Sequence, residues 1–190
     1  MRVFIDTTLW AYRLDQREPA KSEHVHEWLA DIVADHEVVI STQVLIELRS
    51  VVSRKLQPPL SDQQITALLA ALAGFEVVST DANLIFDAHQ LAIREQLSWF
   101  DALIAEAAIR SHCIVLYSED FGHGRRIASL DVVNPLRGCD QTKGGNLPGL
   151  QRGVQLIMVR LTMLGAGCAA HEQPRCHGMP WRHPGRSSAA

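Results

Sequence analysis

Along residues 1–137, short and almost wholly apolar runs alternate with longer stretches in which apolar residues recur every three or four positions. The apolar runs predict strands, which are RVFI (2–5), EVVI (37–40), EVVS (76–79), CIVLYS (113–118) and LDVVNP (130–135). Strands that are apolar on both faces are typical of a parallel sheet covered by helices on both sides.

The stretches between these runs predict amphipathic helices. They cover about 19–35, 41–56, the segment from PPLSDQQ to Gly74, 81–96 and 98–111. In the first of them Val25, Leu29 and Ile32 share one face, and Ser41 or Thr42 is placed to cap the second. The connections are mostly a few residues long, as in other α/β proteins. We therefore expect a three-layer α/β/α sandwich with a central, mostly parallel sheet of four to five strands.

Residues 138–190 have a different character from residues 1–137. They hold nine of the twelve glycines and four of the eight prolines, and they show no amphipathic period. The sequence predicts a separate C-terminal extension that is poorly ordered or non-native. It contains metal-ligand residue types, but their spacing matches no zinc pattern. These residues are Cys168, His171, Cys176 and His177.

Composition narrows the class of protein. No run approaches the ~20 apolar residues that span a bilayer, and the chain does not begin with the basic and apolar segments of a signal peptide. We therefore expect a cytoplasmic protein. Cys113 is the one cysteine in the patterned region, so no disulfide framework is predicted. The net charge of the chain is −3. Residues 138–190 contain six Lys or Arg and two Asp or Glu, a charge of +4, so residues 1–137 carry −7.

Two carboxylates follow predicted strands. Asp6 ends the first strand, and Asp120 comes just after the fourth, beside Ser118 and Glu119. In open α/β sheets, ligands bind beyond the carboxyl ends of the strands, near the point where the strand order reverses. The two acids can face each other if their strands are neighbours. The alternative for Asp6 is an ordinary turn residue or helix N-cap.

Two further carboxylates come from predicted helices. Glu47 flanks the apolar stripe of its helix, so it can point at the sheet edge; the alternative is a solvated acid that pairs with Arg54 or a neighbouring base. Asp101 lies in the first turn of a later helix, where Ser98 and Asp101 also fit a capping box. Each acid alone has an ordinary structural explanation.

The four acids together form an ordered set, and with their surroundings they resemble a known family. Residues 1–137 resemble a PIN domain, in particular the VapC-type toxins of bacterial type II toxin–antitoxin systems. The matching pieces are FIDTTLWAY, STQVLIELRSVV, LSWFDALIAEAA and LYSEDFGHG, in the order and at the spacing of the family. Residues 138–190 have no counterpart in the family pattern.

The resemblance implies a metal-dependent endoribonuclease that hydrolyses RNA and acts as a toxin. It implies catalytic and metal-binding roles for four acids, with one or two Mg²⁺ or Mn²⁺ ions; these are Asp6, Glu47, Asp101 and Asp120. Thr7 and Ser118 become assisting hydroxyls, and Glu119 is either an extra metal contact or a solvated turn acid. His123 is a general acid in principle or a surface residue. The implied partners are an RNA substrate, a second copy in a homodimer, and an antitoxin whose tail enters the acidic pocket.

The chemistry of the four acids is consistent with a bound divalent cation. Hard divalent ions prefer carboxylate oxygens and water, and they can activate a nucleophile and neutralise charge in phosphodiester hydrolysis. Two like charges 4 Å apart repel by ~4 kcal/mol at an effective dielectric constant of 20, so clustered acids call for a counter-ion. Opposing this, RNA affinity comes largely from Lys and Arg, and residues 1–137 are acidic. Their basic residues are partly clustered at Arg49, Arg54, Lys55, Arg125 and Arg126.

Two other functions stay open on the sequence. A PIN-like scaffold with weak or no catalysis would bind a partner protein without cutting RNA. A metal-dependent phosphatase of the haloacid-dehalogenase type is disfavoured, because its nucleophilic Asp is followed two residues later by a second Asp, and here that position is Thr8.

Overall fold

The computed structural model describes residues 1–137. The predicted extension at 138–190, with its four candidate metal ligands, lies outside the described residues. The six strands are β1 (Arg2–Ile5), β2 (Glu37–Ser41), β3 (Glu76–Val78), β4 (Val115–Tyr117), β5 (Arg126–Ile127) and β6 (Leu130–Val133). The six helices are α1 (Thr7–Leu14), α2 (Pro19–Asp35), α3 (Thr42–Arg54), α4 (Asp62–Leu72), α5 (Ala82–Glu95) and α6 (Trp99–Arg110).

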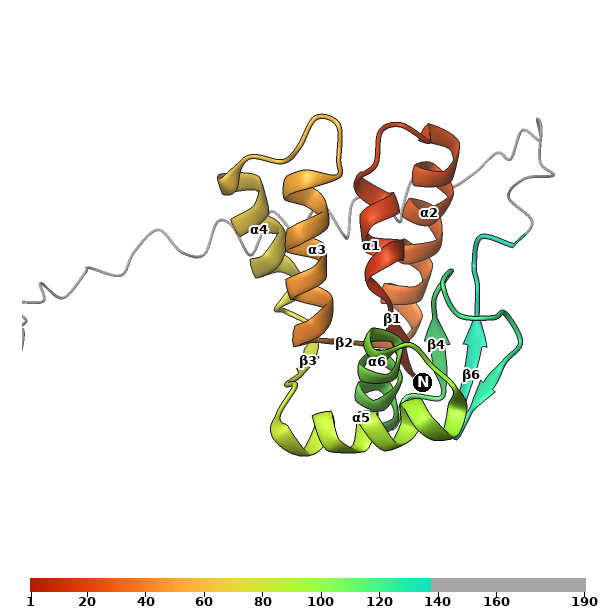
Figure 1. Cartoon of the computed structure of the whole chain (residues 1–190). Coiled ribbons are helices and arrows are strands. Elements are labelled where there is room, and N and C mark those ends of the chain that lie inside the picture. Colours follow the sequence, from red (N-terminus) through yellow and green to blue (C-terminus); the bar gives the residue numbers. More distant parts are fainter. Residues whose placement is uncertain (138–190) are drawn as a thin grey trace, which may run out of the picture.

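The strands form one sheet in the order β3-β2-β1-β4-β6-β5, and all neighbours are parallel except β5 and β6. The chain first builds outward from β1 to β2 and β3, and then returns to place β4 on the other side of β1. Helices α1–α4 therefore lie on one face of the sheet, and α5 and α6 lie on the other (Figure 1). The predicted three-layer α/β fold is confirmed, and its strand order reverses between β1 and β4.

Two elements differ from the sequence-based expectation. Strand β5 is only two residues long and pairs antiparallel with β6, so the sheet has six strands within residues 1–137. Helix α1 was not predicted, because eight residues are too few to show a helical period. It begins directly after Asp6, whose side chain accepts a hydrogen bond from the backbone of Thr7.

The core lies between the sheet and both helical layers. Val3, Phe4 and Ile5 of β1 are all fully buried, which is the expected burial on both faces. Trp10 on α1 packs against Phe75, with ring centroids 5.7 Å apart. Within residues 1–137, no helix combines the length and the apolar character needed to cross a bilayer.

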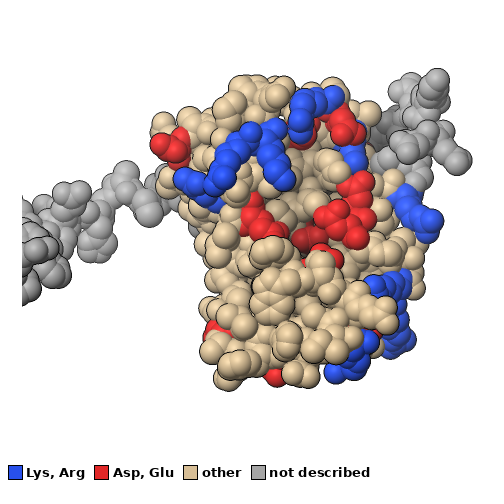
Figure 2. All heavy atoms as spheres, viewed as in Figure 1, with Lys and Arg blue, Asp and Glu red and all other residues tan. Residues whose placement is uncertain are grey.

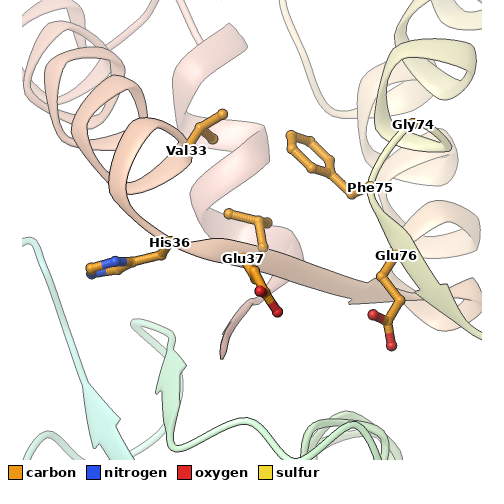
Figure 3. A pocket seen from close by; sticks show the side chains of 7 residues that line it. Val33, His36, Glu37, Gly74, Phe75 and Glu76 are labelled. Carbon is orange, nitrogen blue, oxygen red and sulfur yellow. The ribbon is translucent and has the colours of Figure 1, made fainter. Parts of the chain in front are cut away.

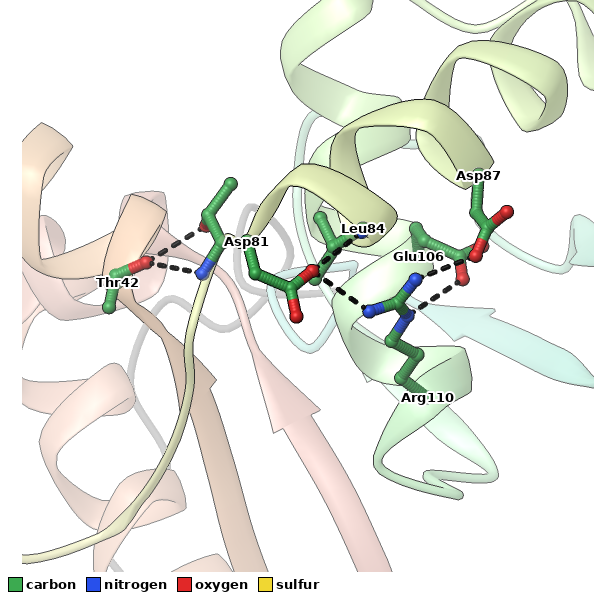
Figure 4. Close-up of polar contacts among 7 residues, drawn as sticks. Thr42, Asp81, Leu84, Asp87, Glu106 and Arg110 are labelled. Carbon is green, nitrogen blue, oxygen red and sulfur yellow. Dashed lines mark hydrogen bonds and ion pairs between the residues drawn. The ribbon is translucent and has the colours of Figure 1, made fainter.

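A polar network joins α5 to α6, on the face of the sheet opposite to α1–α4 (Figure 4). The Arg110 guanidinium near the end of α6 lies 2.6 Å from Asp87, 3.2 Å from Asp81 and 3.5 Å from Glu106. Asp81 also caps α5 by accepting from the backbone N–H of Leu84 at 2.7 Å. The network holds α6 against α5, and the first turn of α6 carries Asp101.

Candidate metal-binding site at the carboxyl edge of the sheet

Asp6 and Ser118 meet where the strand order reverses. They follow the neighbouring strands β1 and β4, and the Ser118 hydroxyl donates to Asp6 Oδ2 at 2.6 Å. The backbone N–H of Thr7 donates to Asp6 Oδ1 at 2.6 Å. The helix-cap interpretation of Asp6 is therefore correct, and it coexists with a position at the topological switch point. Asp6 is only 5% exposed.

Burial raises the pKa of the Asp6 carboxyl to about 6. The hydrogen bonds from Ser118 and Thr7 favour the charged form and oppose this rise, whereas the negative charges of Asp120 and Glu47 add to it. Asp6 is thus a buried carboxylate whose charged form is destabilised by two other carboxylates.

Glu47 reaches the same area from α3. The Thr7 hydroxyl donates to Glu47 Oε2 at 2.8 Å, and the Gln43 amide donates to Glu47 Oε1 at 2.6 Å. Within the described chain Glu47 forms no ion pair, so the alternative pairing with Arg54 does not occur. Thr7 therefore joins the two acids, its backbone bonding to Asp6 and its side chain to Glu47. Gln43 was not among the predicted residues, although its spacing of four from Glu47 on one helix face was a usable signal.

Asp120 and Asp101 complete the group. The Asp120 backbone N–H donates to Ser118 Oγ at 3.1 Å. Its exposed carboxylate is near enough for its charge to raise the pKa of Asp6. Partial loss of water contact raises the pKa of Asp120, and the charges of Glu119, Asp101 and Glu47 raise it further. Asp101 is therefore close enough for its charge to act on Asp120.

The capping alternative for Asp101 is only half realised. Its backbone N–H donates to Ser98 Oγ at 3.2 Å. The Ser98 backbone N–H donates no hydrogen bond to the Asp101 carboxylate in the described region, in contrast to Ser61 and Gln64, which form both bonds of a capping box. The Asp101 side chain is thus not occupied with capping its own helix.

The four acids share a lack of cationic partners. None of them forms an ion pair within residues 1–137, whereas Asp15 pairs with Arg17 at 2.6 Å and Glu119 with Lys21 at 3.1 Å. In Figure 2, acidic side chains gather at the centre of one face, with Lys and Arg side chains above them and to their right. The pairing with Lys21 separates Glu119 from the unpaired acids.

Carboxylates and hydroxyls are the donor types that Mg²⁺ and Mn²⁺ accept. As the side chains stand, no three His, Cys, Asp or Glu in the described segment are arranged as ready ligands to one ion. The hydroxyls of Thr7 and Ser118 instead bind the carboxylate oxygens of Glu47 and Asp6. The donor types fit a divalent cation, and the side chains would have to rearrange to bind one. His123 accepts from the Asn134 backbone through Nδ1 at 3.1 Å and is exposed, which favours the surface-residue interpretation.

A separate hollow of about 310 Å³ opens at the opposite, amino edge of the sheet. Val33 and Phe75 line it together with Glu37 and Glu76 (Figure 3). Arg2 forms ion pairs with both of these carboxylates. This hollow lies away from the four acids, and its charges are already compensated.

These observations define a doubly wound α/β domain with unpaired carboxylates at its switch point. The chain belongs to the PIN domain family, whose sequence profile matches residues 3–128. No curated protein matches the chain.

The chain is similar to several solved structures. VapBC-1 from nontypeable Haemophilus influenzae is 17% identical, with a TM-score of 0.50, and the match covers 71% of this chain and 98% of that one. DNA-bound VapBC from Salmonella typhimurium is 18% identical, with a TM-score of 0.50 and coverage of 70% and 96%. VapBC2 from Rickettsia felis, bound to a fragment of promoter DNA, is 24% identical, with a TM-score of 0.48 and coverage of 70% and 97%.

Proposed function

We propose that this PIN domain is a metal-dependent endoribonuclease and the toxin of a toxin–antitoxin pair. The observation that carries the proposal is the buried carboxylate of Asp6, whose pKa is raised further by the charges of Asp120 and Glu47. Asp101 in turn acts on Asp120, and none of the four acids has a cationic partner in the described region. Such a group of like charges is unfavourable without a bound cation. Membership of the PIN family and the resemblance to VapC-type toxins make RNA the proposed substrate.

In this proposal each side chain has a defined task. Asp6 anchors a Mg²⁺ or Mn²⁺ ion, because Thr7 and Ser118 hold its carboxylate in one orientation. Asp101 and Asp120 would supply further carboxylate oxygens to the same ion. Glu47, held by Thr7 and Gln43, orients a water molecule or contacts a second ion. When bound, the metal would activate the attacking water and neutralise charge on the phosphate.

The distribution of charge suits a substrate that is gripped around the site. The acidic area occupies the centre of the face in Figure 2, and Lys and Arg side chains lie above it and to its right. Phosphates next to the scissile bond can therefore contact basic side chains while the scissile phosphate meets the metal. This arrangement reduces the conflict between an acidic domain and a polyanionic substrate.

The proposed partners are a cognate antitoxin and a second copy of the chain. The two structures with TM-scores of 0.50 are both VapBC structures, in keeping with an antitoxin partner. The unpaired acids would receive a basic residue of the antitoxin, which would compete with the metal and silence the enzyme. PIN-like protein binding without catalysis remains the second candidate, and the experiment below separates the two.

The test of the proposed activity is RNA cleavage with controlled metal content. We expect the full chain to cut cellular RNA internally in Mg²⁺ or Mn²⁺, to lose the activity in EDTA, and to regain it when Mn²⁺ is added in excess. Gel analysis and sequencing of the new RNA ends would show the cuts. Absence of cleavage with every divalent ion and RNA class tested, by protein that still binds a partner, would favour the scaffold instead.

We propose that the homodimer forms through an apolar surface on α5 and the start of α6. Phe86, Ile93 and Phe100 are 69%, 64% and 58% exposed there. Clustered exposed apolar side chains are typical of interaction surfaces.

Replacing Phe86 with Asp is expected to convert the dimer to a monomer, because it places a charge in an apolar interface. Sedimentation or light scattering would measure the mass. Ile114→Asp is the matched control, since Ile114 is 49% exposed but precedes β4 at the amino edge of the sheet. A Phe86→Asp protein that stays dimeric at the wild-type concentration would refute this interface.

A further inference from the structure

Lys21 on α2 reaches the residue next to Asp120. Its ammonium group lies 3.1 Å from Glu119 Oε1 and 3.7 Å from the centroid of the Tyr12 ring. The Lys21 and Glu119 side chains are only 21% and 30% exposed, so water screens this pair less than a fully exposed ion pair. Neither Lys21 nor Tyr12 belongs to the group of four acids.

The pair holds the short segment after β4 at a second point. On one side of Asp120, the Ser118 hydroxyl accepts from the Asp120 backbone and donates to Asp6. On the adjacent residue, Glu119 is tied to α2 through Lys21. The segment is thus connected to β1 and to α2, and the Asp120 carboxylate has no partner of this kind within residues 1–137.

Glu119 would otherwise compete with Asp120. The two carboxylates are adjacent in sequence, and both belong to a segment at the metal-binding edge of the sheet. An unrestrained Glu119 could turn toward a bound ion and displace its neighbour. The ion pair with Lys21 and the contact of Lys21 with the Tyr12 ring direct Glu119 toward α2 instead.

We propose that Lys21 is a positioning residue of the metal site: it holds Glu119 against α2 and so leaves Asp120 as the ligand that this segment supplies. The inference rests on the proposed function, because it assumes that the four acids bind a divalent ion. Lys21 acts through Glu119 and does not touch the metal.

The test is Mn²⁺ binding to the full chain, measured by electron paramagnetic resonance of free Mn²⁺ without any substrate. Lys21→Met is expected to weaken binding by about tenfold, the lower end of the effects seen when residues that hold metal ligands are changed. Lys21→Arg, which keeps the charge, is expected to restore most of the affinity. In a Glu119→Gln background, Lys21→Met should change the affinity by less than about threefold, since the carboxylate that it restrains is gone.

Several outcomes would overturn this role. One is an equal Mn²⁺ affinity of Lys21→Met and wild type. Another is the same loss of affinity from Lys21→Met in the wild-type and Glu119→Gln backgrounds, because Lys21 would then act without Glu119. A raised KM for RNA with unchanged Mn²⁺ affinity would assign Lys21 to phosphate binding instead. If Lys21→Met does not fold, as judged by its thermal midpoint, Lys21→Gln takes its place in the same cycle. Failure of the wild-type chain itself to bind Mn²⁺ would refute the proposed function, and with it this inference.

Discussion

Replacing Asp6 with Asn is expected to reduce RNA cleavage at saturating Mn²⁺ by about 10³-fold or more. A loss of that size corresponds to roughly 4 kcal/mol of transition-state stabilisation, a reasonable share of what a bound metal supplies. Asn can still accept the hydrogen bond from Thr7 that caps α1, so the local fold should survive. What it removes is the negative charge at the centre of the four acids.

Single-turnover cleavage of an end-labelled RNA would measure this effect. Asp15→Asn is the matched control, because Asp15 is also buried, at 7% exposure, but pairs with Arg17 away from the site. The control is expected to keep most of the activity. An Asp6→Asn protein that cleaves within tenfold of the wild-type rate would show that Asp6 does not hold the catalytic metal.

The same substitution is expected to stabilise the metal-free domain at neutral and alkaline pH. Burial raises the pKa of Asp6 to about 6 in the folded protein, from its ordinary value of 3.8. The stability that this raised pKa contributes is fully present below about pH 4 and is lost as the pH rises through about 6. Two pKa units correspond to about 3 kcal/mol of the free energy of unfolding. The wild type has lost this amount at pH 8, whereas a neutral Asn at position 6 cannot ionise and does not lose it.

Because Asn cannot satisfy all the hydrogen bonds of the carboxylate, we expect a net gain of about 1–2 kcal/mol at pH 8, and none at pH 4. Thermal unfolding in EDTA at the two pH values would measure it. Addition of Mn²⁺ should then stabilise the wild type and leave Asp6→Asn unchanged. Asp15→Asn should be destabilising, since Arg17 lowers the pKa of Asp15 to about 2. Equal destabilisation by Asp6→Asn at both pH values would contradict the expected burial of a charged Asp6.

The layers of the fold and the edge of the sheet that carries the candidate site could be predicted from the sequence. Apolar runs predicted every strand of the parallel sheet, and the ends of two of them placed Asp6 and Ser118 at one edge. Helix α1 was missed because it is short, and its start depends on the cap that Asp6 provides. Helices with a long periodic pattern could therefore be recognised, whereas the short helix α1 could not.

The contacts of the site side chains could not be predicted in the same way. Asp6 and Ser118 are 112 residues apart in the chain, and their hydrogen bond depends on the order of the strands. The sequence offered Arg54 as a partner for Glu47, but the fold brings Thr7 and Gln43 to it. Lys21 carries no local signal at all, since its contact with Glu119 joins α2 to the segment after β4. Such contacts arise from tertiary packing.

The most direct measurement is anomalous diffraction at the manganese edge from crystals of the full chain soaked in Mn²⁺. We expect a peak at the carboxyl edge of the sheet, with an Asp6 oxygen about 2.0–2.3 Å from the ion, close to the distances of other hard cations. Asp101 and Asp120 should lie within direct or single-water reach of the same ion. A lattice soaked to saturation that shows no manganese beside Asp6, or in which Asp101 points away from Asp120, would contradict the proposed nuclease site.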